Sequence, residues 1–266
     1  MSGIDLESEY NNRARVPEHP AIIAGWAKDA AAYREAKPPR VIRYGDGERH
    51  TFDLFEAGAG PIVMFIHGGY WQALDKSFFS HMAAGLNRLG VSVAVPSYDL
   101  CPDVALGDII RQMRRASLTL HGERQVPIIA SGHSAGGHLA ACLLATEECV
   151  TSAYSISGLF DLAPLIETSL NKKLQLSPEQ AKAYSPLFWP APAGKSLDAM
   201  VGGEESREFH RQSAAMVEVW GAGHTDVRVE TLAGANHFTV IAPLADPASP
   251  VVARLRDLTL RSNTHV

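Results

Sequence analysis

The sequence is poor in cysteine, in long apolar runs and in excess positive charge. Its 266 residues include three cysteines, Cys101, Cys142 and Cys149. They are too few and too scattered for a disulfide framework or a paired-cysteine metal site, so we expect three buried free thiols. No run approaches the roughly 18 apolar residues of a transmembrane helix, and we expect no membrane partner. Lys and Arg number 24 against 29 Asp and Glu, a net charge of −5, which argues against a nucleic-acid partner.

Signals for secretion, a metal or a nucleotide are also missing. Residues 1–10 are acidic and polar and have neither the basic nor the apolar region of a secretory signal, so the sequence predicts a cytoplasmic location. The chain contains no HExxH motif and no Walker sequence. The glycine pairs at 45/47 and 58/60 lack the strand–loop–helix context of a dinucleotide site and are interpreted as turns. We therefore expect no metal and no cofactor.

The composition that remains is typical of a globular protein, with 46% hydrophobic and 20% charged residues. Helical periodicity covers residues 21–36, and a Gly-Asp-Gly turn at 45–47 predicts a β-hairpin with strands at 41–44 and 50–56. Apolar runs predict further strands at 62–66, 91–96, 127–130, 150–156, 197–201 and 227–232. Helical segments lie between and after these strands, at 76–89, 104–120, 135–146, 206–221 and 251–262.

This alternation predicts an α/β fold. The central sheet is expected to be mostly parallel, covered by helices on both faces and bordered by the antiparallel hairpin. Residues 1–266 are expected to form a single domain that begins with a helical arm at residues 1–39. Residues 158–192 break the alternation, because five prolines interrupt a stretch that is too long for a simple connection. We expect this stretch to form a small cap over one end of the sheet.

Residues 132–136 read Gly-His-Ser-Ala-Gly and join an apolar run to an Ala-rich helical segment. This strand–turn–helix context is that of a nucleophile elbow, in which a sharp turn exposes a serine hydroxyl at the end of the sheet. The two glycines remove side chains that would clash on such a strained turn. The motif alone is weak, and its context carries the prediction that Ser134 is a catalytic nucleophile.

A second glycine-rich stretch, His-Gly-Gly-Tyr-Trp at residues 67–71, directly follows a predicted strand. Acyl transfer needs two backbone N–H groups aimed at the developing oxyanion. One is expected from Ala135, which follows the nucleophile, and the other from Gly68 or Gly69, between which the sequence does not choose. His67 is interpreted as a structural residue that shapes this loop.

Aromatic residues are expected to form the substrate pocket. Tyr70 and Trp71 follow the predicted oxyanion loop and are candidate contacts for an aryl or apolar substrate group, with packing between cap and core as the alternative. The cap is expected to line the rest of the pocket through Leu159, Phe160, Phe188 and Trp189.

The general base is expected late in the chain. His237 follows the strand predicted at 227–232 and precedes the final helix, so it would lie at the same end of the sheet as the nucleophile. His224 precedes that strand and is expected at the opposite end. His265 lies in the terminal tail. These positions make His237 the candidate base.

The acid that orients this base is expected after the preceding strand, which ends at Gly202-Gly203. Two adjacent candidates follow, Glu204 and Glu205, and position alone does not choose between them. Ser206 is expected to cap the next helix, which makes Glu205 the residue on the tight turn.

The order of Ser, acid and His, each after its own strand, is that of α/β hydrolases. The chain resembles this superfamily from about residue 40 to residue 262, and within it the kynurenine formamidase (arylformamidase) group. The stretches that carry the resemblance are HGGYW at 67–71, the elbow at 132–137, GLFDL at 158–162, ESREFHRQS at 205–213 and YNNRARVP at 10–17.

The resemblance implies an activity. It places the acid on Glu205, a position where the group often has Asp. It implies a small-molecule substrate, N-formyl-L-kynurenine, which is hydrolysed to kynurenine and formate in tryptophan breakdown. An amino-acid substrate requires partners for its carboxylate, yet the sequence shows no basic residue near the predicted site, because Lys172, Lys173 and Lys182 of the cap are interpreted as solvated.

Two other functions and the oligomeric state remain open at this stage. A carboxylesterase or amidase for other small acyl or aryl compounds would use the same residues. A non-catalytic binding protein with a hydrolase fold is disfavoured by the intact set of Ser134, Glu205 and His237. A homodimer is compatible with the final amphipathic helix and an exposed edge strand.

Overall fold

One sheet organises residues 4–262, the part of the chain that the computed structural model describes. Its strand order is β1-β2-β4-β3-β5-β6-β7-β8. The strands are β1 (Arg40–Arg43), β2 (Thr51–Phe55), β3 (Ile62–Ile66), β4 (Val93–Pro96), β5 (Ile128–His133), β6 (Val150–Ile156), β7 (Ser196–Gly202) and β8 (Asp226–Leu232). β2 runs antiparallel to both β1 and β4, and the other neighbouring pairs are parallel. The predicted α/β fold, with an antiparallel hairpin on a mostly parallel sheet, is confirmed.

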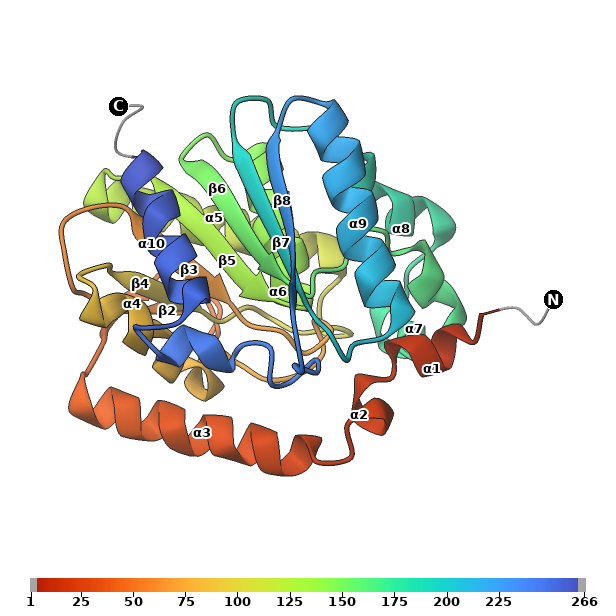
Figure 1. Cartoon of the computed structure of the whole chain (residues 1–266), viewed down its shortest axis with the longest axis horizontal. Coiled ribbons are helices and arrows are strands. Elements are labelled where there is room, and N and C mark those ends of the chain that lie inside the picture. Colours follow the sequence, from red (N-terminus) through yellow and green to blue (C-terminus); the bar gives the residue numbers. More distant parts are fainter. Residues whose placement is uncertain (1–3, 263–266) are drawn as a thin grey trace.

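Helices cover both faces of this sheet (Figure 1). Successive residues of β3 point to opposite faces, so Met64 belongs to one apolar core and Phe65 to the other. The first core is closed by α5 (Leu106–Arg124), α6 (Ala135–Thr146) and α9 (Arg207–Ala222). The second is closed by α3 (His19–Ala36), α4 (Ala84–Arg88), the 3-10 turn η5 (Ala242–Ala245) and α10 (Pro250–Ser262).

The N-terminal arm consists of α1 (Leu6–Tyr10), α2 (Asn12–Arg15) and α3. α3 begins two residues before its predicted start, with Pro20 in its first turn, where the missing N–H breaks no intrahelical hydrogen bond. In Figure 1 the arm runs along the lower side of the molecule, where the parallel strands end. Open α/β sheets carry their binding sites at these carboxyl ends, so the arm lies where a site is expected.

The connection from β6 to β7 contains only short helices. They are η3 (Ala163–Glu167), α7 (Asn171–Leu174), α8 (Pro178–Ala183) and η4 (Pro186–Phe188), where η marks a 3-10 helix. Three of them have proline in the first turn, a position that suits the start of a helix. This connection spans the predicted cap, and it contacts the arm, because Glu7 accepts hydrogen bonds from the amide and the hydroxyl of Ser169.

The single helix predicted at residues 76–89 is wrong. Two 3-10 turns, η1 (Lys76–Phe78) and η2 (Ser80–Ala83), precede the short α4. Between the turns Phe79 has a non-helical backbone, with φ −125° and ψ 8°. Its buried ring lies 5.4 Å from that of Trp26 and 5.8 Å from that of His67. The helix is interrupted because this tertiary packing turns Phe79 inward.

The cysteines are free thiols, as predicted, but they are not all buried. Cys101 and Cys142 are buried, whereas Cys149 is half-buried. Burial raises the pKa of the Cys142 thiol, so this residue lacks the thiolate character of a nucleophile. Within residues 4–262 no helix is long and apolar enough to cross a membrane. His265 lies outside the described residues.

Candidate active site

Ser134 occupies a strained turn between β5 and α6. Its backbone has φ 55° and ψ −116°, a region that side chains other than glycine rarely adopt. Its amide donates to the carbonyl oxygen of Ile156, at 2.8 Å. A Cβ on Gly132 would overlap the carbonyl of Gly136, and a Cβ on Gly136 would overlap that of Ile66. The two glycines of the predicted elbow are therefore required by the close approach of three backbone segments.

Glu205 and His237 are joined by a short hydrogen bond. Glu205 Oε2 lies 2.6 Å from His237 Nδ1, and the glutamate side chain is fully buried. Its other oxygen, Oε1, accepts hydrogen bonds from the Ser157 hydroxyl at 2.5 Å and the Gly202 amide at 2.7 Å. Because the carboxylate binds the N–H at Nδ1, Nε2 of His237 is the nitrogen that can accept a proton. Glu204 is exposed, so the structure brings Glu205, and not its neighbour, to the histidine.

Sequence reasoning missed Ser157. It follows β6 with φ 52°, and its amide donates to the carbonyl of Met200 on the adjacent β7, at 2.7 Å. This contact turns its hydroxyl toward Glu205. The sequence did contain a signal for this role. Ser157 is a polar residue at the end of β6, and β6 lies next to β7, the strand that precedes Glu205.

His133, the second residue of the elbow motif, was also missed. Its Nε2–H donates to the carbonyl oxygen of His237 at 2.8 Å. Burial, together with the neighbouring His237, lowers the pKa of His133 well below its usual value. The rings of His133 and Phe209 lie 4.7 and 4.6 Å from the His237 ring. A neutral His133 can therefore hold the His237 loop without opposing a positive charge on His237.

The loop that carries the predicted oxyanion donors Gly68 and Gly69 lies beside Ser134. A Cβ on Gly68 would lie 3.2 Å from the Cβ of Ser134, so the loop after β3 passes directly beside the serine. Within the described chain, the amides of Gly68, Gly69 and Ala135 donate no hydrogen bond. Unused amides beside a nucleophile are what an oxyanion requires. Both glycines remain candidates for the second donor.

His67 shapes this loop, in agreement with the structural role predicted for it. Its ring is stacked between those of Phe79 and Tyr98, with centroid distances of 5.8 and 4.2 Å. Nδ1–H donates to the Gly68 carbonyl at 2.8 Å, and the Tyr98 hydroxyl donates to the His67 carbonyl at 2.9 Å. Burial lowers the pKa of His67 to about 4, so it is neutral near pH 7.

These buried histidines make stability depend on pH. Burial lowers the pKa of both His67 and His138 to about 4, below the value of about 6.5 in an unfolded chain. The unfolded state therefore binds more protons between these values, and the free energy of unfolding falls as pH drops from 6.5 toward 4. We expect His138→Gln, which keeps a donor for the Tyr184 carbonyl, to reduce this slope by about 1 kcal/mol per pH unit.

Urea unfolding at pH 7, 6 and 5 measures this slope. His224→Gln is the matched control, because His224 is exposed. Equal slopes for the wild type and both variants would contradict the burial effect.

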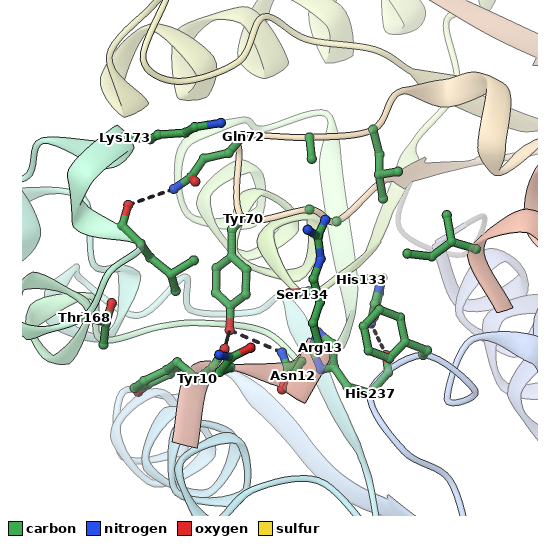
Figure 2. A pocket seen from close by; sticks show the side chains of 18 of the residues that line it. Tyr10, Asn12, Arg13, Tyr70, Gln72, His133, Ser134, Thr168, Lys173 and His237 are labelled. Carbon is green, nitrogen blue, oxygen red and sulfur yellow. Dashed lines mark hydrogen bonds between the residues drawn. The ribbon is translucent and has the colours of Figure 1, made fainter. Parts of the chain in front are cut away.

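A cavity of about 230 Å³ is lined by Ser134 and His237 (Figure 2). Part of its wall is apolar and largely aromatic, with Trp26 beside His133 and Phe238 beside His237. The other apolar side chains that line the cavity include Ile23, Leu74 and Phe79. The polar side chains that line the cavity are Glu7, Asn11, Asn12, Arg13, Gln72, Thr168, Ser169 and Lys173, and Asn12 binds the hydroxyl of Tyr70. A small ligand with an apolar body and a polar end fits such a wall.

Tyr70 lines this cavity and is held by the arm. Its hydroxyl donates to the Tyr10 carbonyl at 2.7 Å and accepts from Asn12 Nδ2 at 3.2 Å. The buried Tyr10 hydroxyl in turn donates to Glu208 Oε2 at 2.8 Å and accepts from Gln212 Nε2 at 3.0 Å. The stretches at 10–17 and 205–213, which both resemble the formamidase group, are thus parts of one hydrogen-bonded structure beside the site.

Trp71 does not line the cavity. It is fully buried, and its ring packs edge-on against that of His138 at 5.0 Å. The backbone of the loop, with positive φ at Gly69, Tyr70 and Trp71, turns Tyr70 toward the cavity and Trp71 into the core. Trp71 therefore follows the packing alternative and is not retained as a substrate contact.

The cap lines the cavity with residues other than those predicted. Leu159 and Phe160 are buried in the core, and Phe188 is 52% exposed. Gln212 Oε1 accepts from the Phe160 amide at 2.8 Å, which draws the start of the cap toward α9. The cap residues that line the cavity are Thr168, Ser169, Leu170 and Lys173.

Two basic residues line the cavity, against the sequence expectation. Arg13 comes from α2 and Lys173 from α7. Arg13 belongs to the 10–17 stretch that carries the resemblance, which was the signal that could have found it. Within residues 4–262 no group of three or more His, Cys, Asp or Glu side chains is placed to hold a metal ion.

Known proteins similar to this chain are hydrolases. No protein-family model matches it. Kynurenine formamidase of Salmo salar is 29% identical over 224 residues, which are 77% of this chain and 76% of that protein. Kynurenine formamidase of Drosophila melanogaster is 28% identical over 243 residues, 82% of this chain and 81% of the other. Isoprenylcysteine α-carbonyl methylesterase of Arabidopsis thaliana is 26% identical over 181 residues, 59% of this chain and 42% of that enzyme.

Solved structures show the same architecture. A Silicibacter protein described as a candidate thioesterase is 37% identical, with a TM-score of 0.85 over 94% of this chain and 98% of its own. An esterase of Pyrobaculum calidifontis is 14% identical, with a TM-score of 0.71 over 91% of this chain and 93% of its own, and it shows the fold alone. The chain is thus similar in sequence to the kynurenine formamidases, and it belongs to the α/β-hydrolase superfamily.

Proposed function

We propose that this protein is a serine hydrolase that removes the formyl group from an aryl formamide such as N-formyl-L-kynurenine. Ser134 is the nucleophile, His237 the general base and Glu205 the acid that orients it. One observation carries the proposal: the histidine that binds the buried Glu205 lines the same small cavity as the serine on the strained turn. The formamidase relatives supply the substrate class.

The acylation step follows from this geometry. Ser134 Oγ attacks the formyl carbon, and His237 Nε2 takes the hydroxyl proton. Ala135 and one of Gly68 and Gly69 donate their unused amides to the oxyanion of the tetrahedral intermediate. The C–N bond then breaks, and the proton held by His237 passes to the departing aryl amine.

Deacylation reverses these roles. A water molecule attacks the formyl ester of Ser134 while His237 removes its proton. The bond between Ser134 Oγ and the formyl carbon then breaks, formate leaves, and His237 returns the proton to Ser134 Oγ. Three hydrogen bonds hold the Glu205 carboxylate in place, and it stabilises the imidazolium that forms twice per turnover.

A carboxylesterase is the second candidate function. The same residues would cleave an ester, which is more easily hydrolysed than an amide. The apolar wall beside His237 would accept an aryl or alkyl ester group. The methylesterase relative supports this alternative.

Steady-state hydrolysis of N-formyl-L-kynurenine, compared with that of 4-nitrophenyl acetate and butyrate, separates the two functions. We expect kcat/KM for the formamide to exceed both ester values by at least about tenfold, a transition-state difference of about 1.4 kcal/mol, with no turnover in a Ser134→Ala blank. Ester turnover without formamide turnover would reject the formamidase proposal and retain the serine mechanism. Turnover that survives in the blank would reject both.

A place in tryptophan breakdown, a cytoplasmic location and a homodimer belong to this proposal as well. The relatives' substrate supports the first. The exposed edge strand β8, where Val229 is 50% exposed, is compatible with the third.

A further inference from the structure

Two cations face the cavity without partners. Arg13 and Lys173 both line it (Figure 2). Among the described residues, neither the Arg13 guanidinium nor the Lys173 ammonium takes part in a hydrogen bond or an ion pair. Arg211, by contrast, binds Glu208 through two nitrogens.

The carboxylates of the cavity do not neutralise these two cations. Glu7 lines the same polar wall, but it binds the amide and hydroxyl of Ser169, at 2.6 and 2.7 Å. These bonds lower the pKa of Glu7. Glu205 is buried behind His237 and binds it. The polar end of the cavity thus presents two free positive charges in a protein whose net charge is −5.

The two cations come from different parts of the chain and line the same cavity. Arg13 is on α2 of the arm and Lys173 on α7 of the cap. In Figure 2 Lys173 and Gln72 lie at one side of Tyr70, and the Arg13 side chain extends from α2 toward the level of Ser134. Both groups donate hydrogen bonds and carry positive charge, so each can bind an anionic group that enters the cavity.

We propose that Arg13 and Lys173 form an anion-binding subsite for a carboxylate on the leaving group of the substrate. This inference rests on the proposed function and narrows it: the preferred substrate is an aryl formamide that carries a carboxylate. The apolar wall of Trp26, Phe79 and Phe238 takes the aryl ring, and the two cations take the acidic substituent. The subsite sets KM and specificity, while the chemical step remains with Ser134 and His237.

The test compares two substrates that differ by a single carboxylate, N-formylanthranilate and formanilide. We expect Arg13→Gln/Lys173→Gln to lower the ratio of their kcat/KM values by about tenfold, mainly through a higher KM for the acidic substrate. A tenfold change in this ratio lies between the change expected from loss of an exposed ion pair and that expected from loss of a hydrogen bond to a charged group. Arg15→Gln and Lys172→Gln are matched controls, because both residues are exposed, lie on the same two helices and do not line the cavity. They should leave the ratio unchanged.

Two further measurements keep the proposal falsifiable. In the wild type, raising ionic strength should lower kcat/KM for N-formylanthranilate but not for formanilide, since screening acts only on the charged substrate. Arg13→Lys, which keeps the charge, should recover part of the lost ratio. An unchanged ratio in a folded double variant, or equal salt dependence of both substrates, would overturn the subsite.

Failure of the proposed function is distinguishable from failure of the subsite. If the wild type hydrolyses neither formamide, the formamidase proposal fails. The ester pair 4-acetoxybenzoate and phenyl acetate then replaces the formamides in the same comparison. A ratio that falls in the double variant supports the subsite, and one that does not fall overturns it.

Discussion

Replacing Ser134 with alanine is expected to lower kcat by about 10⁶-fold, because nucleophile and base act as one unit. KM should change little, since the hydroxyl contributes to the transition state more than to ground-state binding. His237→Ala should have a similar effect, and the double variant should be no slower than either single variant. Stopped assays of formate release measure kcat, and mass spectrometry after treatment with a fluorophosphonate should find the label on Ser134 alone.

Measurements of stability serve as the control, because they show whether the Ser134 variants remain folded. Alanine keeps the strain of φ 55° and ψ −116°, so thermal unfolding of Ser134→Ala should match the wild type. Ser134→Gly should be equally inactive but more stable by about 1 kcal/mol, because glycine tolerates positive φ. Residual kcat in folded Ser134→Ala above about 1% of wild type would exclude Ser134 as the nucleophile, since the triad serine accounts for a far larger factor.

Replacing Glu205 with glutamine is expected to lower kcat by about 10⁴-fold, the cost of losing the correct histidine tautomer. The amide nitrogen of glutamine donates where the carboxylate accepts, and the His237 imidazolium loses its buried counter-charge. Glu204→Gln is the matched control, because Glu204 is adjacent and exposed, and its kcat should stay near that of wild type. Equal effects of the two substitutions would remove Glu205 from the triad.

Two more variants test the length of the Glu205 side chain and the hydrogen bond that holds it. Glu205→Asp keeps the charge but shortens the side chain, so the 2.6 Å contact with His237 lengthens and kcat should fall less than in Glu205→Gln. Ser157→Ala removes only the hydroxyl that binds Glu205 Oε1. We expect a loss of about tenfold in kcat, the effect of one charged hydrogen bond that positions another group.

Local patterns in the sequence predicted the frame of the site. The continuous apolar run of β3 was identified with the same bounds as in the structure, because buried parallel strands are apolar along nearly their whole length. The bounds of β6 were also predicted, although Thr151, Ser152 and Ser155 interrupt its apolar residues. The elbow at 132–136 was recognisable because a sharp turn around a serine requires glycine at these two positions. The structure adds that a side chain on Gly136 would collide with the carbonyl of Ile66. His237 followed from chain order alone, since each site residue ends its own strand.

Other parts of the site depend on contacts between distant segments. The choice of Glu205 over Glu204 depends on which carboxylate reaches His237, Ser157 and Gly202. The inward turn of Phe79, which ends the predicted helix early, depends on packing against Trp26 and His67.

The sequence by itself thus determined the α/β fold, the elbow serine and the late histidine, because periodicity and turn chemistry are local properties of the chain. Chain position alone did not choose between Glu204 and Glu205, and the tertiary structure shows that Glu205 binds His237. Only the tertiary structure decided which residues line the cavity. Arg13 lies 121 positions before Ser134 in the chain and yet shares its cavity. Helical and strand patterns do not record that proximity, because the arm reaches the site through contacts with distant segments, among them its hydrogen bonds to Tyr70, Glu208 and Gln212.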